Sequence, residues 1–213
     1  MKHITFYLDF ISPYAHLAFE ALPQALLGLS YSVSYKPVLL GAILKHHGQL
    51  GPAEIDAKRS WTYRQVGWLA GQNKIALQMP SVHPFNPLPL LRLAVASSAQ
   101  GDPNRWVCES VFQHVWFGGA DPLDESRLAQ LKERLASINA LDPEQTKSLL
   151  HQHTEAAIAH GVFGVPAFVV DEKLFWGFDA LPMLRDYLQG NEWFSSPAWD
   201  AASQVPVGVV RKR

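Results

Sequence analysis

Segments with β-strand character lie near the two ends of this chain, and their placement constrains the fold more than any other feature. Residues 4–10 are rich in β-branched and aromatic side chains, which predicts a buried strand. Ser12-Pro13 follows at once, and apolar residues then recur at helical spacing as far as Leu22. A second strand is predicted over residues 30–38. The chain therefore opens with a strand, a helix and a strand.

The last part of the chain returns to strand character after Gly161, a candidate helix C-cap. A hairpin is predicted there with Asp171-Glu172 at its turn, and a helix follows. The tail beyond Gly190 is expected to be irregular. In order, the predicted elements are a strand over residues 165–170, a strand over 173–176 and a helix over 180–188.

Helical patterns fill the region between these two parts. Apolar stripes at helical spacing indicate several amphipathic helices, and Cys108 lies on one stripe, so it is interpreted as a core residue. Gln145 favours a capping box at the start of the last helix. Four pairs of a capping residue and a proline are expected to start helices with proline at the first helical position: Ser12-Pro13, Asn86-Pro87, Asp102-Pro103 and Asp142-Pro143.

This order of elements predicts an α/β fold with an inserted helical block. The two outer parts can share one mixed sheet only if the middle is inserted between them. Residues 1–40 and 161–213 are therefore expected to form one discontinuous domain, and residues 41–160 an all-helical insertion domain.

Composition excludes several classes of function. Of the 213 residues 48% are apolar and 17% are charged, which is typical of a folded chain with a real core. The net charge of -1 favours neither nucleic acid nor a membrane surface as a partner, and the tail Arg211-Lys212-Arg213 is interpreted as solvated. The single cysteine, Cys108, permits no intramolecular disulfide. We find no pattern of a signal peptide or a membrane span, and we expect a cytoplasmic protein.

Ser12 stands between the first strand and the first helix. The simplest interpretation is an ordinary helix N-cap, because serine before proline is favoured there. The same position also favours an anion, since free amides and the helix dipole point toward it. A hydroxyl at this place can donate to a bound thiolate.

Two further motifs lie in the C-terminal part. In Val165-Pro166 the proline is either simply tolerated at the first position of a strand or part of a cis peptide. The cis form would leave the Val165 backbone free to pair with an extended ligand. Asp179, in Trp176-Gly177-Phe178-Asp179, is either a helix N-cap or a partner for the charged ends of a small peptide.

Taken in order, the three motifs resemble those of the 2-hydroxychromene-2-carboxylate isomerase family. They are also similar to kappa-class glutathione transferases, and both groups are thioredoxin-like and related to bacterial disulfide oxidoreductases. The resemblance covers residues 4–188 and implies a thioredoxin-like fold. Redox relatives carry Cys-Pro-x-Cys where this chain has Ser12-Pro13-Tyr14-Ala15, so dithiol exchange at this site is excluded.

The resemblance implies that the thiol comes from bound glutathione. Ser12 would hydrogen-bond its sulfur, Val165 would pair with its backbone, and Trp176, Gly177, Phe178 and Asp179 would hold its γ-glutamyl end. In the implied isomerase mechanism the thiolate adds to the conjugated ring of the substrate, the ring opens, a single bond rotates, and elimination releases trans-o-hydroxybenzylidenepyruvate.

The aromatic carboxylate substrate needs partners from the helical block. The resemblance implies Asn86 and Gln49 for this role, and Lys45 is a further candidate, for which a solvated lysine is the simpler interpretation. Two departures concern specificity: Gln49 stands where the isomerases have asparagine, and Ala180 follows Asp179 where they have arginine. The same machinery could therefore serve a different substrate.

Histidine pairs raise the question of a metal site. His46-His47 and His151-Gln152-His153 lack acidic or cysteine ligands at matching spacing, so no metal is predicted. Lys36, at the end of the second predicted strand, is interpreted as a solvated lysine, as is Lys45.

The function predicted from the sequence is a glutathione-dependent isomerase of aromatic-compound degradation. One alternative is a kappa-like glutathione transferase. Another is a non-catalytic glutathione or peptide binder that keeps the fold without turnover. A homodimer is possible in each case.

Overall fold

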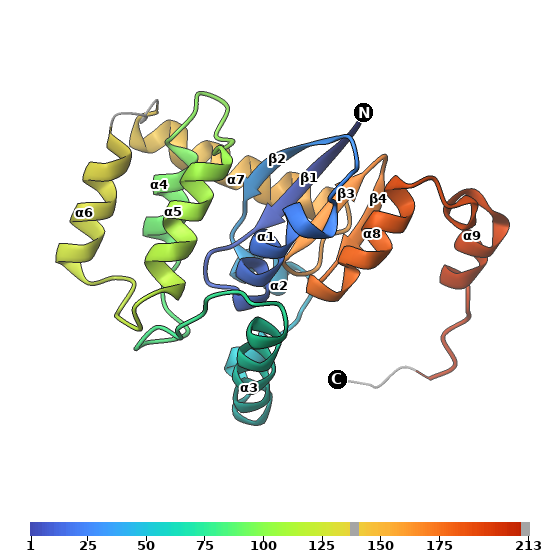
Figure 1. Ribbon diagram of the computed structural model, residues 1–213, viewed down its shortest axis with the longest axis horizontal. Coiled ribbons are helices and arrows are strands. Elements are labelled where there is room, and N and C mark those ends of the chain that lie inside the picture. Colours follow the sequence, from blue (N-terminus) through green and yellow to red (C-terminus); the bar gives the residue numbers. More distant parts are fainter. Residues whose placement is uncertain (137–140, 210–213) are drawn as a thin grey trace.

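The computed structural model describes residues 1–136 and 141–209, so the basic tail Arg211-Lys212-Arg213 lies outside the described residues. The strands form one four-stranded sheet in the order β2-β1-β3-β4, which crosses the middle of the molecule (Figure 1). The strands are β1 (Lys2–Leu8), β2 (Tyr31–Pro37), β3 (Ala167–Val170) and β4 (Lys173–Trp176).

Both ends of the chain contribute to this sheet, as the sequence predicts. β1 pairs in parallel with β2, and on its other side it pairs antiparallel with β3. Phe6 lies opposite Tyr35 on one neighbour and opposite Phe168 on the other. The β3–β4 hairpin turns at Asp171-Glu172, where both residues have positive φ, as a tight two-residue hairpin turn requires.

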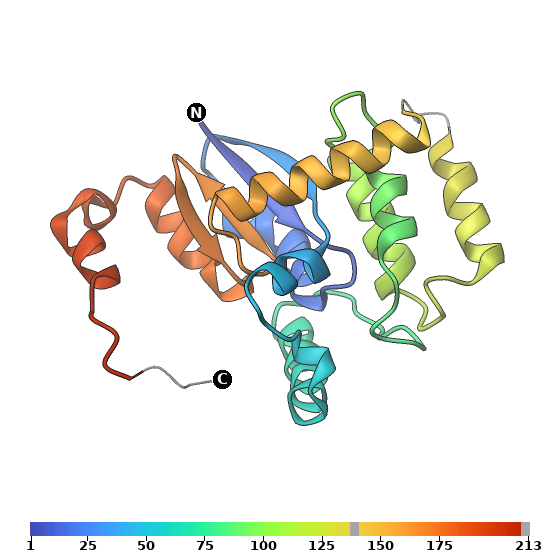
Figure 2. The same cartoon turned by 180° about the vertical axis from the view of Figure 1, so that it is seen from behind.

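Helices cover both faces of the sheet. α1 (Pro13–Ala25) and α8 (Leu181–Leu188) lie on one face, and α2 (Leu40–His46) and α7 (Pro143–Ala159) lie on the other (Figures 1 and 2). The alternation of side chains along a strand explains this arrangement. Ile4, Phe6 and Leu8 of β1 join the core formed with α1 and α8. Tyr7, between them, joins a second core with α2 and α7.

Between β2 and β3, the described part of the chain contains helices and the loops that connect them, and no strand. The helix α7 ends at Ala159, and Gly161 follows with a φ of 76°, which fits its predicted role at a helix C-terminus. Besides α2 and α7, this block contains η1 (Pro52–Glu54), α3 (Asp56–Gln72), α4 (Leu88–Val95), α5 (Arg105–Trp116) and α6 (Glu125–Leu135). α3 projects away from the sheet, below it in Figure 1.

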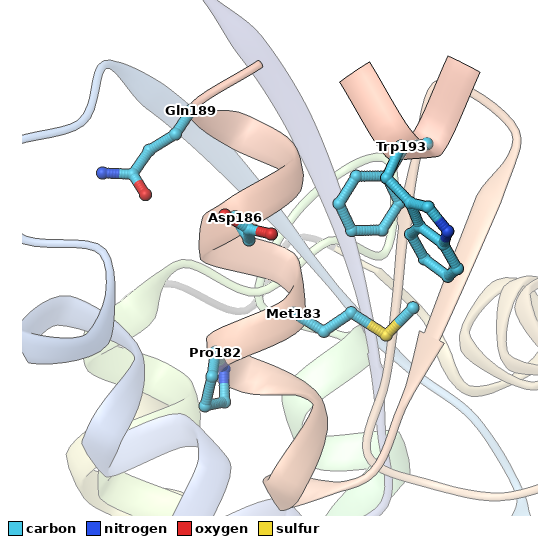
Figure 3. Close-up of a pocket in the computed structure, with 6 residues that line it drawn as sticks. Pro182, Met183, Asp186, Gln189 and Trp193 are labelled. Atoms are coloured by element: carbon cyan, nitrogen blue, oxygen red, sulfur yellow. The ribbon is translucent and has the colours of Figure 1, made fainter. Parts of the chain in front are cut away.

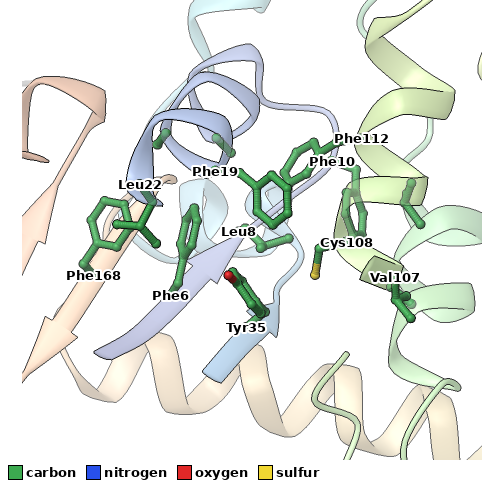
Figure 4. Close-up of a cluster of buried hydrophobic side chains, with 14 of the residues drawn as sticks. Phe6, Leu8, Phe10, Phe19, Leu22, Tyr35, Val107, Cys108, Phe112 and Phe168 are labelled. Atoms are coloured by element: carbon green, nitrogen blue, oxygen red, sulfur yellow. The ribbon is translucent and has the colours of Figure 1, made fainter. Parts of the chain in front are cut away.

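One continuous core joins the sheet to the inserted helices (Figure 4). The Phe112 ring of α5 packs against Phe10 at 4.9 Å and against Phe19 at 5.0 Å between ring centroids. Cys108 is fully buried in the same core, and burial raises the pKa of its thiol, which confirms its assignment as a core residue. The domain boundaries at residues 40 and 160 stay a prediction, but this core crosses them.

Two of the four predicted helix starts need correction. α4 begins at Leu88, one residue later than predicted, because the Asn86 side chain accepts the Leu88 amide at 3.1 Å and Pro87 itself is the cap. α5 begins at Arg105, and its N-cap is Asn104, whose side chain accepts the Val107 amide at 3.0 Å.

The starts at Ser12-Pro13 and Asp142-Pro143 are confirmed. The second includes the predicted capping box, in which Gln145 bonds back to the Asp142 amide.

The expectation of an irregular tail beyond Gly190 is wrong. A 3-10 turn, η4 (Glu192–Ser195), and a short helix, α9 (Pro197–Ser203), follow there. They form because Phe194 is buried, and Trp199 packs against it at 5.4 Å between ring centroids. Among residues 1–136 and 141–209, no helix has the length and apolar character needed to cross a membrane.

Candidate functional site

Ser12 ends the loop after β1 and caps α1. Its backbone is extended, with φ of -87° and ψ of 116°, and its Oγ accepts the Ala15 amide at 3.2 Å. The same hydroxyl donates to the Val165 carbonyl oxygen at 3.4 Å. Ser12 is only 6% exposed. The N-cap prediction is therefore confirmed, and the hydroxyl also faces the second motif.

Of the two alternatives for Val165-Pro166, the structure has the cis peptide bond. β3 begins after it, at Ala167, so the Val165 backbone stands outside the sheet. Within residues 1–136 and 141–209, the Val165 amide donates to no protein acceptor. The Pro166 carbonyl is occupied, because it accepts the Gly177 amide at 2.9 Å. An extended ligand could therefore pair with Val165 at this end of the sheet.

The third motif lies beside the second. Trp176 is half exposed, and its ring packs against Phe163 at 4.8 Å between centroids. Its indole also explains Gly164, because a Cβ at that position would lie 2.8 Å from Trp176 Nε1. The chain segment that leads into Val165 thus fixes the position of the half-exposed Trp176 ring.

Asp179 is not the predicted helix N-cap. It lies inside the 3-10 turn η3 (Phe178–Ala180), and the cap of α8 is Ala180. Its exposed carboxylate folds back over Gly177, where any side chain would collide with it, and Gly177 has a φ of 102°. The pKa of Tyr14 in α1 is raised, chiefly by burial and further by the Asp179 charge. The turn η3, which carries Asp179, packs against α1 through Phe178, and Asp179 caps no helix.

The structure brings Ser12, Val165 and the third motif together at one end of the sheet, where β1 and β4 end and β3 begins. Hydrogen bonds from Ser12 to Val165 and from Gly177 to Pro166 connect them. Phe178 packs with Tyr14 and Leu17 of α1. This site holds a hydroxyl, an available backbone amide, the N-terminus of α1 and one exposed carboxylate, which together suit an anionic atom attached to a small extended peptide.

The predicted substrate residues lie apart from one another. Gln49 lines a pocket of about 570 Å³ with Gly48, Leu50, Ile55 and Lys58. Lys45 is exposed in the last turn of α2, and Asn86 is exposed and engaged with the start of α4. In the described part of the chain, no hydrogen bond joins any of the three to Ser12 or Val165. Their role in substrate binding stays a prediction.

The Gln49 region is nevertheless tied to the site. His47 Nε2 lies 3.1 Å from the Val162 carbonyl oxygen, which only accepts, so the ring nitrogen donates. This bond holds the end of α2 against the segment that carries Gly164 and Val165.

A second pocket, of about 560 Å³, lies on the outer face of α8 (Figure 3). Met183, Asp186 and Trp193 line it, and none of them belongs to the three motifs. It is a separate feature from the site around Ser12.

Asp9, three residues before Ser12, is a buried residue beside the site that sequence analysis missed. It is fully buried, and its two carboxylate oxygens accept the Ile11 amide at 3.2 Å and the Leu40 amide at 2.9 Å. Burial raises its pKa to about 7 against the opposing effect of these amides. The signal that could have revealed it is an acidic residue in an otherwise apolar strand end.

Lys36 and Asp102 also differ from expectation. Lys36 Nζ pairs with Asp102 Oδ1 at 2.5 Å, so it is not a freely solvated lysine, and Asp102 caps no helix. Asp102 also accepts from His153 Nε2 at 3.3 Å, and these two partners lower its pKa although burial alone would raise it. Among the described residues, no three potential ligands of the kinds His, Cys, Asp or Glu gather around a common point.

Comparison with known proteins places these observations in a family. The family model of the DSBA-like thioredoxin domain matches residues 3–189. A solved structure of 2-hydroxychromene-2-carboxylate isomerase superposes with a TM-score of 0.69 at 24% identity, covering 95% of this chain and 100% of that chain. These matches confirm the predicted thioredoxin-like fold with inserted helices.

Two relatives match over most of their length. The 2-hydroxychromene-2-carboxylate isomerase of Sphingobium xenophagum is 27% identical over 195 residues, which cover 88% of this chain and 98% of the relative. The glutathione S-transferase kappa 1 of Rattus norvegicus is 24% identical over 205 residues, which cover 88% of this chain and 90% of the relative. These matches confirm the resemblance that the three motifs indicated.

Proposed function

Because the chain belongs to the DSBA-like thioredoxin domain family, we propose that it is a glutathione-dependent isomerase acting on 2-hydroxychromene-2-carboxylate or a close analogue. The names of its relatives support a reaction of the isomerase or glutathione-transferase kind. The observation that carries the proposal is the approach of the Ser12 hydroxyl to Val165 at the start of α1, with no cysteine in either segment.

Glutathione fits the groups that surround Ser12. The Val165 amide has no acceptor in the described part of the protein and can pair with the cysteinyl backbone of an extended tripeptide. The exposed Asp179 carboxylate offers a partner for the ammonium of its γ-glutamyl end. The N-terminus of α1 and the Ser12 hydroxyl then favour the sulfur as an anion.

When bound, glutathione would supply a thiolate nucleophile. The protein's own contribution is to stabilise that anion and to orient the substrate. Ser12 can redirect its single proton from the Val165 carbonyl, because their separation of 3.4 Å makes a weak bond. Lowering the pKa of the bound thiol raises the fraction of nucleophile present at neutral pH.

The substrate is proposed to lie between Ser12 and the Gln49 pocket. This pocket contains Lys58, whose ammonium suits the carboxylate of a small aromatic acid, beside the apolar side chains of Leu50 and Ile55. Gln49, Lys45 and Asn86 are the proposed polar partners, and a homodimer is a further proposal.

The experiment is an assay of the purified protein, freed of small thiols, with 2-hydroxychromene-2-carboxylate and with a standard electrophile. S-methylglutathione is the matched control, because it has the peptide backbone without a nucleophilic sulfur. We expect isomerisation only with glutathione. We also expect both peptides to protect the Val165 amide in NMR hydrogen exchange, while Val169, inside β3, is unaffected.

Three outcomes separate the candidate functions. Full isomerisation without any thiol would overturn the proposal. Conjugation of the electrophile without isomerisation would assign the protein to the kappa-like transferase activity. Protection of Val165 without turnover of either compound would indicate a non-catalytic glutathione binder.

A further inference from the structure

The peptide groups that lead into Ser12 are held from both sides. The first joins Phe10 to Ile11. The Phe10 carbonyl accepts the indole Nε1 of Trp116 at 3.1 Å, and the Ile11 amide donates to Asp9 Oδ1 at 3.2 Å. Both polar groups of this peptide therefore have buried or half-buried protein partners.

The second peptide joins Ile11 to Ser12 and is held in the same way. His83 Nε2 lies 2.8 Å from the Ile11 carbonyl oxygen, and the Ser12 amide donates to the Asp9 carbonyl at 3.0 Å. Rotation of this peptide would break both bonds. It would also turn Ser12 Oγ away from the Ala15 amide, which it now accepts.

The tautomer of His83 follows from its partners. The Ile11 carbonyl can only accept, so Nε2 carries the proton. Nδ1 must then accept, and the Tyr63 hydroxyl, 2.6 Å away, donates to it. Burial lowers the pKa of His83 and so favours this neutral form. Tyr63 thus fixes which ring nitrogen faces the loop.

Both donors come from the block inserted between β2 and β3. Trp116 is the last residue of α5, His83 lies in the segment between α3 and α4, and their rings are 5.6 Å apart. Tyr63 stands on α3. The insertion therefore contacts the loop that carries Ser12 directly, in addition to forming the wall of the proposed substrate pocket.

We propose that His83 is a positioning residue for Ser12, and that Tyr63 holds His83 in the tautomer this role requires. The bond from His83 Nε2 fixes the plane of the Ile11–Ser12 peptide and so the direction of the Ser12 hydroxyl. The effect on a bound thiolate rests on the proposed function. The effect on the loop does not.

Glutamine and asparagine at position 83 form a matched pair of variants. The amide nitrogen of His83→Gln reaches about as far as Nε2 and can still donate to the Ile11 carbonyl. His83→Asn is shorter and cannot. Tyr63→Phe is a milder third variant, because it leaves His83 in place and removes the hydroxyl that lies 2.6 Å from Nδ1 and 3.1 Å from the His83 carbonyl oxygen.

The first measurement needs no ligand. Hydrogen exchange of single amides by NMR reports the bonds from Ser12 to Asp9 and from Ala15 to Ser12. We expect both amides to exchange about tenfold faster in His83→Asn than in His83→Gln, the scale of one lost buried hydrogen bond. The Val107 amide, capped by Asn104, serves as the reference and should not change.

Equal exchange in the two variants, or an equal rise at Val107, would make His83 an ordinary structural residue and overturn the proposal. If His83→Asn does not fold, Tyr63→Phe decides the question through ring nitrogen chemical shifts. The wild type should show the Nε2-protonated form, and Tyr63→Phe a mixture. A wild type protonated on Nδ1 would also refute the proposal.

The second measurement is the pKa of the thiol of bound glutathione. We expect it to rise in His83→Asn and to remain near the wild-type value in His83→Gln. An unchanged value in both, with glutathione bound, would limit His83 to the loop and contradict its effect on the thiolate. A wild type that binds no glutathione would refute the proposed function, while the exchange data would still decide the role of His83.

Discussion

The Ser12 hydroxyl lies 3.4 Å from the Val165 carbonyl oxygen while it accepts the Ala15 amide at 3.2 Å. A hydroxyl has one proton to donate, and the usual O–H···O separation is about 2.7–2.8 Å. The proton is therefore held only weakly by Val165. A bound anion near the start of α1 would compete for it, while the Ala15 bond persists.

Ser12→Ala separates the cap from the proposed catalyst. Loss of the cap should lower the free energy of unfolding by about 1 kcal/mol. Loss of the hydrogen bond to the thiolate, about 1.5–3 kcal/mol, should reduce the rate roughly ten- to hundredfold. The pKa of bound glutathione should rise, as followed by thiolate absorbance during a pH titration.

Asp124→Ala is the matched control for this variant. Asp124 caps α6 by accepting the Arg127 amide at 2.9 Å and belongs to none of the site segments. It should lose a similar amount of stability without a change in rate. If Ser12→Ala behaves in the same way, Ser12 is a cap and the anion site lies elsewhere.

Asp179→Asn tests the proposed contact with the γ-glutamyl ammonium. The carboxylate is exposed, so its attraction is screened by water, and we expect glutathione to bind about five- to tenfold more weakly. Titration calorimetry at low and high salt measures this, and only the wild type should lose affinity steeply with salt. Asp186→Asn, on the outer face of α8, is the control. Equal affinities for wild type and Asp179→Asn would remove Asp179 from the site.

Asp9 should make stability depend on pH. Its pKa is about 7 in the folded protein and ordinarily 3.8, so the folded state keeps the proton longer. Its stabilising contribution is full below pH 3.8 and is lost as pH rises to about 7. Denaturant unfolding should show the difference between wild type and Asp9→Asn falling by up to about 1.4 kcal/mol per pH unit in this window. A flat difference would mean that Asp9 is ionised throughout.

His16 should make the stability depend on pH in the opposite direction from Asp9, so that stability is lost as pH falls. It is fully buried, donates to the Ala76 carbonyl at 3.1 Å, and burial lowers its pKa from 6.5 to about 4. Its contribution is therefore full above pH 6.5 and lost as pH falls toward 4. His16→Gln keeps a donor for Ala76 and should remove this loss. The same unfolding series measures it, and a variant that loses stability in acid as the wild type does would contradict the assignment.

Local patterns predicted the parts of the fold that depend on neighbouring residues. Ser12-Pro13, the Gln145 capping box and the Asp171-Glu172 turn are each determined within a few positions, and the structure has all three. The predicted helix start at Asp102-Pro103 was wrong because an equally good cap, Asn104, follows it. In addition, Lys36 and His153 from distant elements bind the Asp102 carboxylate.

The missing part of the site depends on tertiary contacts. Nothing near His83 in the sequence indicates that its ring meets the Ile11 carbonyl, which belongs to a loop 72 positions away. Burial of Asp9 likewise depends on α2 covering it. The family resemblance supplied Val165 and Asp179, which the residues alone left between two interpretations.

The contacts of Phe112 with Phe10 and Phe19 limit how small molecules can reach the site. If the inserted helices swung away as a rigid lid, these rings would be exposed to water, at a cost of several kcal/mol. Small molecules must instead enter and leave the site through smaller movements of the chain. The segment over residues 48–55, which is largely exposed and borders the Gln49 pocket, is the part that can open without breaking the core or the His47 bond to Val162. Movement of this segment, and not of the inserted helices, would therefore admit the substrate of the proposed reaction and release its product.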